Sequence, residues 1–257
     1  MKKILATLLL LTSIQLLAHP CDNLSLDKVP TQSGGRIKPF YVLAKESNDF
    51  LFAQKPKIDL SLLFCKLSLL SQVDFPEKNE LLFKIEHPDA KKFLGLDEHA
   101  NGVSLDVLLS KEEDLRKEYF GRKLNDGLKK EYKLLLRTQT FVSIVNGELW
   151  TIPQGTNWVP INSFFGQWKA NNFQDFSTFI TAEQATYETA HGTKHHLEFS
   201  YFKFKPYVIA LLVTLLSMIL LVSLPRTRLG LSFAFLTILI QIAAITTRII
   251  ISGRAPI

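Results

Sequence analysis

Two apolar runs near the end of the chain read PYVIALLVTLLSMILLVSL (206–224) and LGLSFAFLTILIQIAAITT (229–247), and only PRTR (225–228) separates them. Each run is about 19 residues long, and a helix of that length, rising about 1.5 Å per residue, covers the roughly 30 Å hydrocarbon core of a bilayer. The connection is too short to cross the bilayer again, and its two arginines are stable among headgroups but costly in hydrocarbon. The runs therefore predict a transmembrane helical hairpin. The alternative is a buried hairpin in a soluble protein, which requires a core that encloses two helices apolar on every side.

The amino terminus has the pattern of a secretory signal. The charged segment Met1-Lys2-Lys3 precedes an apolar run from Ile4 to Leu17, and this arrangement is typical of exported proteins. We expect cleavage after Ala18, so that residues 1–18 are a signal peptide. If the segment is not cleaved, it forms a short membrane anchor with the same topology.

An export signal fixes the expected topology. Residues 19–205 then form an extracytoplasmic domain, the two spans follow, and residues 248–257 form a short extracytoplasmic tail. The cations Lys203, Lys205, Arg248 and Arg254 flank the outer side and outnumber the two arginines of the turn, a bias that favours the reverse orientation. We expect the signal to decide, because the exported domain commits the orientation before the later spans are made.

The composition indicates a mainly α protein with little β structure. The chain has 257 residues, 47% of them hydrophobic, and a net charge of +6. Its charges are interleaved rather than gathered in a basic block, so nucleic acid is not an expected partner. Apolar residues recur at helical spacing in Phe40–Gln54, Ile58–Gln72 and much of Asn172–Phe199, whereas Leu81–Glu86 has the pattern of a short strand.

The middle of the chain contains further signals. Ser110 begins a capping-box sequence that predicts a long charged helix towards Val145, with breaks expected at Gly121 and Gly127. The following segment, Glu148–Pro160, brings tryptophan, proline and glycine residues close together, and we expect it to form an irregular loop.

The two cysteines, Cys21 and Cys65, leave two possibilities open. In an oxidising compartment they can pair across about 44 residues, which in the chain-entropy model contributes roughly 3–4 kcal/mol. Otherwise they remain separate thiols, with Cys65 buried on a helix. Their spacing excludes a CxxC redox motif.

Two groups of residues are weak candidates for binding a ligand. Arg36 and Lys38 lie two residues apart in an extended segment, so they can face one side and bind a carboxylate or a propionate; a solvated turn before a helix is the simpler interpretation. Trp150 and Trp158 can stack on a planar ligand, but tryptophans in such a loop more often fill the core of a small domain.

Three histidines, His191, His195 and His196, lie in the last predicted helical region. An i, i+4 pair of histidines can hold a metal ion on one helix face. The segment has no HExxH motif and no accompanying ligand cluster in the sequence, and Gly192 weakens the helix. We therefore expect solvated histidines and no metal site.

Several motifs together resemble a known family. These are Gly34–Pro39, the Trp150–Pro160 segment, Glu198 and Tyr201 before the first span, and the closing Arg248–Pro256. With them the chain resembles the front part of the system II cytochrome c biogenesis proteins, the CcsA/ResB-related haem-handling membrane proteins of bacteria such as Bacteroidetes and Bdellovibrio. The family motif residues are Gly35, Arg36, Lys38, Pro39, Gly253, Arg254 and Pro256; Ala255 stands where proline is more usual.

The resemblance implies an inner-membrane protein whose periplasmic domain supports haem delivery to apocytochrome c. The Trp-rich haem-binding loop and the span histidines of the family are absent from this sequence. We therefore expect no haem on the chain alone, no catalysis by the chain itself, and a truncated or split protein that works with other CcsA/ResB-type subunits. The alternatives are a tethered periplasmic binding or sensing module and, with weaker support, a metal-dependent hydrolase using the three histidines.

Overall fold

The computed structural model describes residues 19–22, 24–111, 113–114, 117, 128–223 and 228–252. The chain divides into two compact units, which we call the amino-terminal unit (Met1–Tyr187) and the hairpin unit (Glu188–Ile257). Most described residues are helical, so the mainly α class is confirmed. Among the described residues, strands form only three antiparallel two-stranded sheets, β1–β2, β3–β4 and β5–β6.

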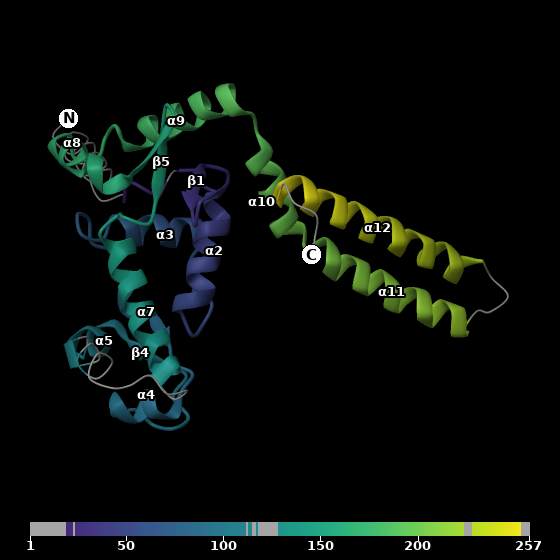
Figure 1. Ribbon diagram of the computed structural model, residues 1–257, viewed down its shortest axis with the longest axis horizontal. Helices are drawn as coiled ribbons and strands as arrows, with labels where there is room; N and C mark the ends of the chain where they lie inside the picture. Colours follow the sequence, from purple (N-terminus) through teal and green to yellow (C-terminus); the bar gives the residue numbers. More distant parts are fainter. Residues whose placement is uncertain are drawn as a thin grey trace, which may run out of the picture. The chain divides into compact units, whose positions relative to one another are not determined.

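The amino-terminal unit alternates short strands with helices (Figure 1). Its elements, in chain order, are β1 (Pro30–Ser33), β2 (Arg36–Pro39), α2 (Phe40–Leu51), α3 (Leu60–Ser68), the 3-10 helix η2 (Pro76–Glu80), β3 (Leu82–Lys84), α4 (Pro88–Phe93), β4 (Gly102–Ser104), α5 (Leu105–Ser110), α7 (Leu128–Val145), β5 (Thr151–Gln154), β6 (Asn157–Pro160), the 3-10 helix η3 (Ile161–Phe164), α8 (Phe165–Ala170) and α9 (Phe176–His191). Helix α9 continues across the boundary between the units.

The helices at the centre of this unit are amphipathic. Helix α2 buries Phe40, Leu43, Ala44 and Leu51, which recur along one face at the spacing of an α-helix. Helix α2 contacts both α3 and α7, so the predicted helices around Phe40 and Leu63 form one core with the third.

An aromatic cluster joins this core to the later part of the chain. The ring of Phe40 lies 5.4 Å from that of Phe64 and 4.5 Å from that of Trp150. Phe176 at the start of α9 contacts both Trp150 and Trp168, with ring centroids 6.0 and 4.9 Å apart. Edge-to-face contacts of this kind add about 0.5–1.5 kcal/mol per pair to the burial of apolar area.

Cys21 and Cys65 form a disulfide, with Cα atoms 6.1 Å apart. Both residues are fully buried, and the bond links the start of the described chain to α3. The sequence left open a disulfide or two separate thiols, and the structure shows the disulfide.

Two expectations for the middle of the chain need correction or completion. The segment 148–160 is not an irregular loop, because β5 and β6 pair across a turn at Gly155. Ser110 is the last residue of α5, and its hydroxyl donates to the carbonyl oxygen of Val107 at 2.8 Å. Residues 113, 114 and 117 are again helical and α7 reaches Val145, while the expected breaks at Gly121 and Gly127 lie outside the described residues.

The hairpin unit contains α10 (Lys194–Phe204), α11 (Pro206–Ser223) and α12 (Leu229–Ser252). Helices α11 and α12 run side by side (Figure 1), and both are long and apolar enough to cross a membrane. Only 11% and 17% of their most apolar windows are buried within the structure, so the described part of the chain does not enclose them as a soluble core would. Helix α12 continues past Thr247, where the span was expected to end, to Ser252.

Small residues line the contact between α11 and α12. Ala210 and Ser217 on α11 are buried, as are Thr237 and Ala244 on α12, and within each helix the two positions lie seven residues apart. The hydroxyl of Ser217 donates to the carbonyl oxygen of Gly230 at 2.8 Å. A spacing of seven keeps small residues on one seam and lets two helices approach closely.

Candidate functional site

The cations of the family-like segment lie on the β1–β2 hairpin. Gly34 and Gly35 both have positive φ, 60° and 72°, which suits a two-residue hairpin turn. Arg36 and Lys38 are two residues apart on β2, yet their surroundings differ. Arg36 is exposed, whereas Lys38 is 8% exposed and its Nζ lies 2.5 Å from the Glu46 carboxylate. The positive charge of Lys38 is therefore matched within the unit, and the two cations do not form a joint anion clamp.

The two tryptophans of the second family-like segment also have different roles. Trp150 is fully buried against Phe40 and Phe176, so its interpretation as a core residue is confirmed. Trp158 on β6 is half-buried and lies against Tyr187, with ring centroids 5.5 Å apart. Burial also raises the pKa of the Tyr187 phenol. Because the two indoles pack on different rings, they do not form one stacking platform.

Thr151 joins the two hairpins to which the family-like segments belong. Its hydroxyl donates to the backbone carbonyl of Gln32 and accepts from the Gln32 amide, each at 3.0 Å. The hydroxyls of Thr31 and Thr151 lie 3.4 Å apart. Strands β1 and β5, some 119 residues apart in sequence, therefore lie side by side (Figure 1).

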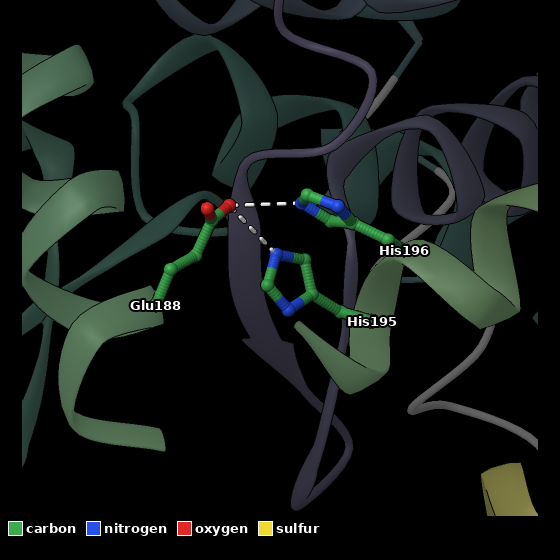
Figure 2. Close-up of side chains that lie close together, drawn as sticks. All are labelled: Glu188, His195 and His196. Carbon is green, nitrogen blue, oxygen red and sulfur yellow. Dashed lines mark hydrogen bonds and ion pairs between the residues drawn. The ribbon is translucent and has the colours of Figure 1, made fainter. Parts of the chain in front are cut away.

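A group of three potential ligands lies at the corner between α9 and α10 (Figure 2). One carboxylate oxygen of Glu188 is 2.8 Å from Nε2 of His196 and 3.4 Å from Nε2 of His195. The two imidazole rings are nearly perpendicular, with centroids 4.5 Å apart. One donor atom from each of the three residues lies within 4.8 Å of the others, so the corner has a compact nitrogen- and oxygen-rich centre.

The backbone at Gly192 produces this corner. Helix α9 carries Glu188 in its last turn and ends at His191, and α10 begins at Lys194. Gly192 has φ of +76°, a conformation that residues with a side chain rarely adopt. The bend at Gly192 brings Glu188 in the last turn of α9 close to His195 and His196 in the first turn of α10, whereas an uninterrupted helix would hold them two turns apart.

The sequence interpretation of the histidines is wrong for two of the three. His195 is 5% exposed and His196 is half-buried, so only His191 is exposed as expected. The expectation that no carboxylate accompanies them is also wrong, because Glu188 contacts both His195 and His196. In one continuous helix Glu188 would lie two turns from His195 and His196, so their sequence spacing did not indicate a contact. Gly192, where the chain bends, was the signal for it.

An open cleft of about 400 Å³ lies elsewhere in the amino-terminal unit, between the end of α2, α3 and η2. Lysines 55 and 57 and glutamates 77 and 80 line it together with apolar side chains. The residues that the sequence singled out are not among those that line it.

The family motif residues Gly253, Arg254 and Pro256 lie outside the described residues. In comparisons with known proteins, no family model and no curated protein matches the chain.

Proposed function

We propose that the chain is a membrane-anchored component of system II cytochrome c biogenesis. Its amino-terminal unit lies on the periplasmic side of the bacterial inner membrane and supports the delivery of haem to apocytochrome c. The hairpin of α11 and α12 holds it in the membrane beside other CcsA/ResB-type subunits. An alternative role is that of a tethered periplasmic binding or sensing module.

One observation carries this proposal. The two segments of the amino-terminal unit that resemble the family, 34–39 and 150–160, belong to hairpins that Thr151 ties together. A resemblance carried by segments that are remote in sequence is more informative than a match to one short motif when the structure brings their two hairpins together.

Two further features support export. The Cys21–Cys65 disulfide is typical of proteins that fold in an oxidising compartment such as the periplasm. The apolar amino-terminal segment after Lys2-Lys3 has the pattern of a secretory signal. Both favour an orientation in which the α11–α12 turn faces the cytoplasm.

The candidate haem-contacting residues of the described amino-terminal unit do not gather into one haem site. Trp150 is part of the core, Trp158 packs on Tyr187, and Lys38 pairs with Glu46. We therefore assign haem binding to the complete assembly, and to this chain the task of presenting the paired hairpins to a partner. Arg36 is exposed near the β1–β2 turn, where we expect it to face that partner.

The test is the ratio of haem-bearing to haem-free cytochrome c after deletion of the gene. Covalently bound haem is measured by peroxidase staining of denaturing gels, and total cytochrome c polypeptide by immunoblotting. We expect the polypeptide to persist while its covalent haem is lost, and a plasmid copy to restore the haem. A deletion strain in which the two signals fall together would favour the sensing alternative, because a regulator changes synthesis rather than haem attachment.

A variant pair separates the hairpin from general stability. Arg36→Glu reverses the charge beside the β1–β2 turn, and Lys169→Glu makes the same change on the exposed surface of α8. We expect Arg36→Glu to lower the haem-bearing fraction at normal protein levels, and Lys169→Glu to leave it unchanged. Equal haem-bearing fractions in the two variants would show that the charge of Arg36 on the β1–β2 hairpin has no part in haem delivery.

A further inference from the structure

We propose that Glu188, His195 and His196 form a binding site for a divalent first-row transition metal ion such as Zn²⁺. The site lies within the hairpin unit, at the corner between α9 and α10 (Figure 2). This inference is independent of the proposed role in haem delivery, because it rests on the geometry of these three side chains alone.

The geometry is close to that of ligands around a single ion. Metal–ligand bonds of about 2.0–2.2 Å place neighbouring ligand atoms roughly 3–3.5 Å apart. The carboxylate oxygen of Glu188 lies 2.8 and 3.4 Å from the two Nε2 atoms, and the whole set spans no more than 4.8 Å. Small rotations of the side chains are enough for all three to bind one ion.

The ligand types indicate the class of metal. Two imidazole nitrogens with one carboxylate oxygen suit Zn²⁺ and its neighbours such as Cu²⁺, Ni²⁺ and Fe²⁺, whereas Mg²⁺ and Ca²⁺ prefer sites made of oxygen. Three protein ligands leave at least one coordination position for water or another ligand. The site would therefore hold an exchangeable group as well as the ion.

The surroundings favour a defined site over a chance contact. His195 is 5% exposed, so its ring is held in place before an ion arrives. Glu188 and the two histidines come from two different helices, and Gly192 sets the angle between them. Binding of an ion would fix the α9–α10 corner, from which α10 leads into the first apolar helix.

The test uses the full chain, purified in mild detergent without a polyhistidine tag. Zn²⁺ is titrated by calorimetry, and Co²⁺ is used as a spectroscopic probe because its visible absorption reports the number and type of ligands. We expect one equivalent of Zn²⁺ to bind, and Glu188→Gln and His196→Gln each to weaken binding at least tenfold. His191→Gln is the matched control, because His191 lies in the same corner but outside the group, and we expect it to leave the affinity unchanged.

Folding is checked separately by thermal unfolding without metal. Zn²⁺ should raise the Tm of the wild-type chain but not that of the Glu188→Gln/His196→Gln double variant. If Glu188→Gln does not fold, the comparison of His196→Gln with His191→Gln decides alone. Equal affinity in the wild-type chain, His191→Gln and His196→Gln, or no Zn²⁺ binding by the wild-type chain, would overturn the proposal.

Discussion

Single polar side chains join parts of the chain that are remote in sequence. Arg137 on α7 is the clearest case. Its Nε donates to the carbonyl oxygen of Phe50 at 2.8 Å, and its Nη1 donates to that of Lys84 at 3.0 Å. Its Nη2 lies 3.4 Å from the carboxylate of Glu86. The planar guanidinium donates in several directions at once, so one residue ties α7 to the end of α2 and to β3.

Replacing this residue should destabilise the amino-terminal unit. Arg137 is 5% exposed, and Arg137→Lys keeps the charge but cannot reach both carbonyl groups, so we expect a loss of about 2–3 kcal/mol in the free energy of unfolding. Denaturant unfolding of the purified chain measures this. Gln139→Ala, on the exposed face of α7, is the control and should change stability by no more than about 0.5 kcal/mol. An Arg137→Lys variant as stable as the wild-type chain would show that the two carbonyl contacts contribute nothing.

Glu86 should give the same region an acid-dependent stability. A hydrogen bond from Lys84, with the nearby charges of Arg137 and Lys133, lowers the pKa of Glu86 from 4.5 to about 2. Because the folded-state pKa lies below the unfolded one, the contribution of ionised Glu86 is complete above pH 4.5 and disappears as the pH falls towards 2.

The variant Glu86→Gln tests the direction of this pH dependence of stability. Its destabilisation relative to the wild-type chain should be greatest near neutral pH and should shrink steadily below pH 4.5. Unfolding free energies measured across this range give the answer, with exposed Glu148→Gln as the control. A difference between the wild-type chain and Glu86→Gln that stays constant over the whole pH range would contradict the assigned ion pairs.

At the scale of elements, periodicity predicted helices well and hairpins poorly. The helices around Phe40 and Leu63 followed from apolar spacing, because burial of one face determines both the pattern and the packing. The β5–β6 hairpin was missed because each strand has only four residues, too few to show alternation, and two prolines masked the pattern. The pairing of Glu188 with His195 could not be predicted either, because it depends on the backbone angle at one glycine.

The seam between α11 and α12 cannot be read from residue size alone. Of the adjacent small residues Ala243 and Ala244, Ala244 is buried and Ala243 is exposed. The other members of the seam, such as Ser217 and Gly230, become apparent only when the two helices are aligned, because the sequence does not show which residues face each other.

Gly230 provides a test of this seam. A Cβ at this position would lie 2.6 Å from the side chain and 2.9 Å from the backbone nitrogen of Leu221. Gly230→Ile should therefore separate the helices and lower the thermal stability of the hairpin in detergent. Ala243→Ile adds the same kind of bulk on an exposed face of α12 and should have little effect. Equal unfolding temperatures for Gly230→Ile and Ala243→Ile would contradict the placement of Gly230 in the contact between α11 and α12.

At the scale of the whole molecule, composition predicted two long apolar helices near the end of a mainly α chain. The two apolar runs were recognisable from length alone, because a bilayer sets that length. The disulfide remained open in the sequence, since the spacing of Cys21 and Cys65 does not say whether folding brings them together. Their pairing in the structure supports the proposed location outside the cytoplasm, because disulfide bonds persist in oxidising compartments.

The most direct test of the proposed arrangement is the side of the membrane on which each part lies. Alkaline phosphatase, which is active only outside the cytoplasm, is fused after Gly147, after Arg228 and after Ser252. We predict activity for the first and third fusions and none for the second, because the signal exports the amino-terminal unit and each helix then crosses once. Activity only in the fusion after Arg228 would place the amino-terminal unit in the cytoplasm and contradict both the topology and the role in haem delivery.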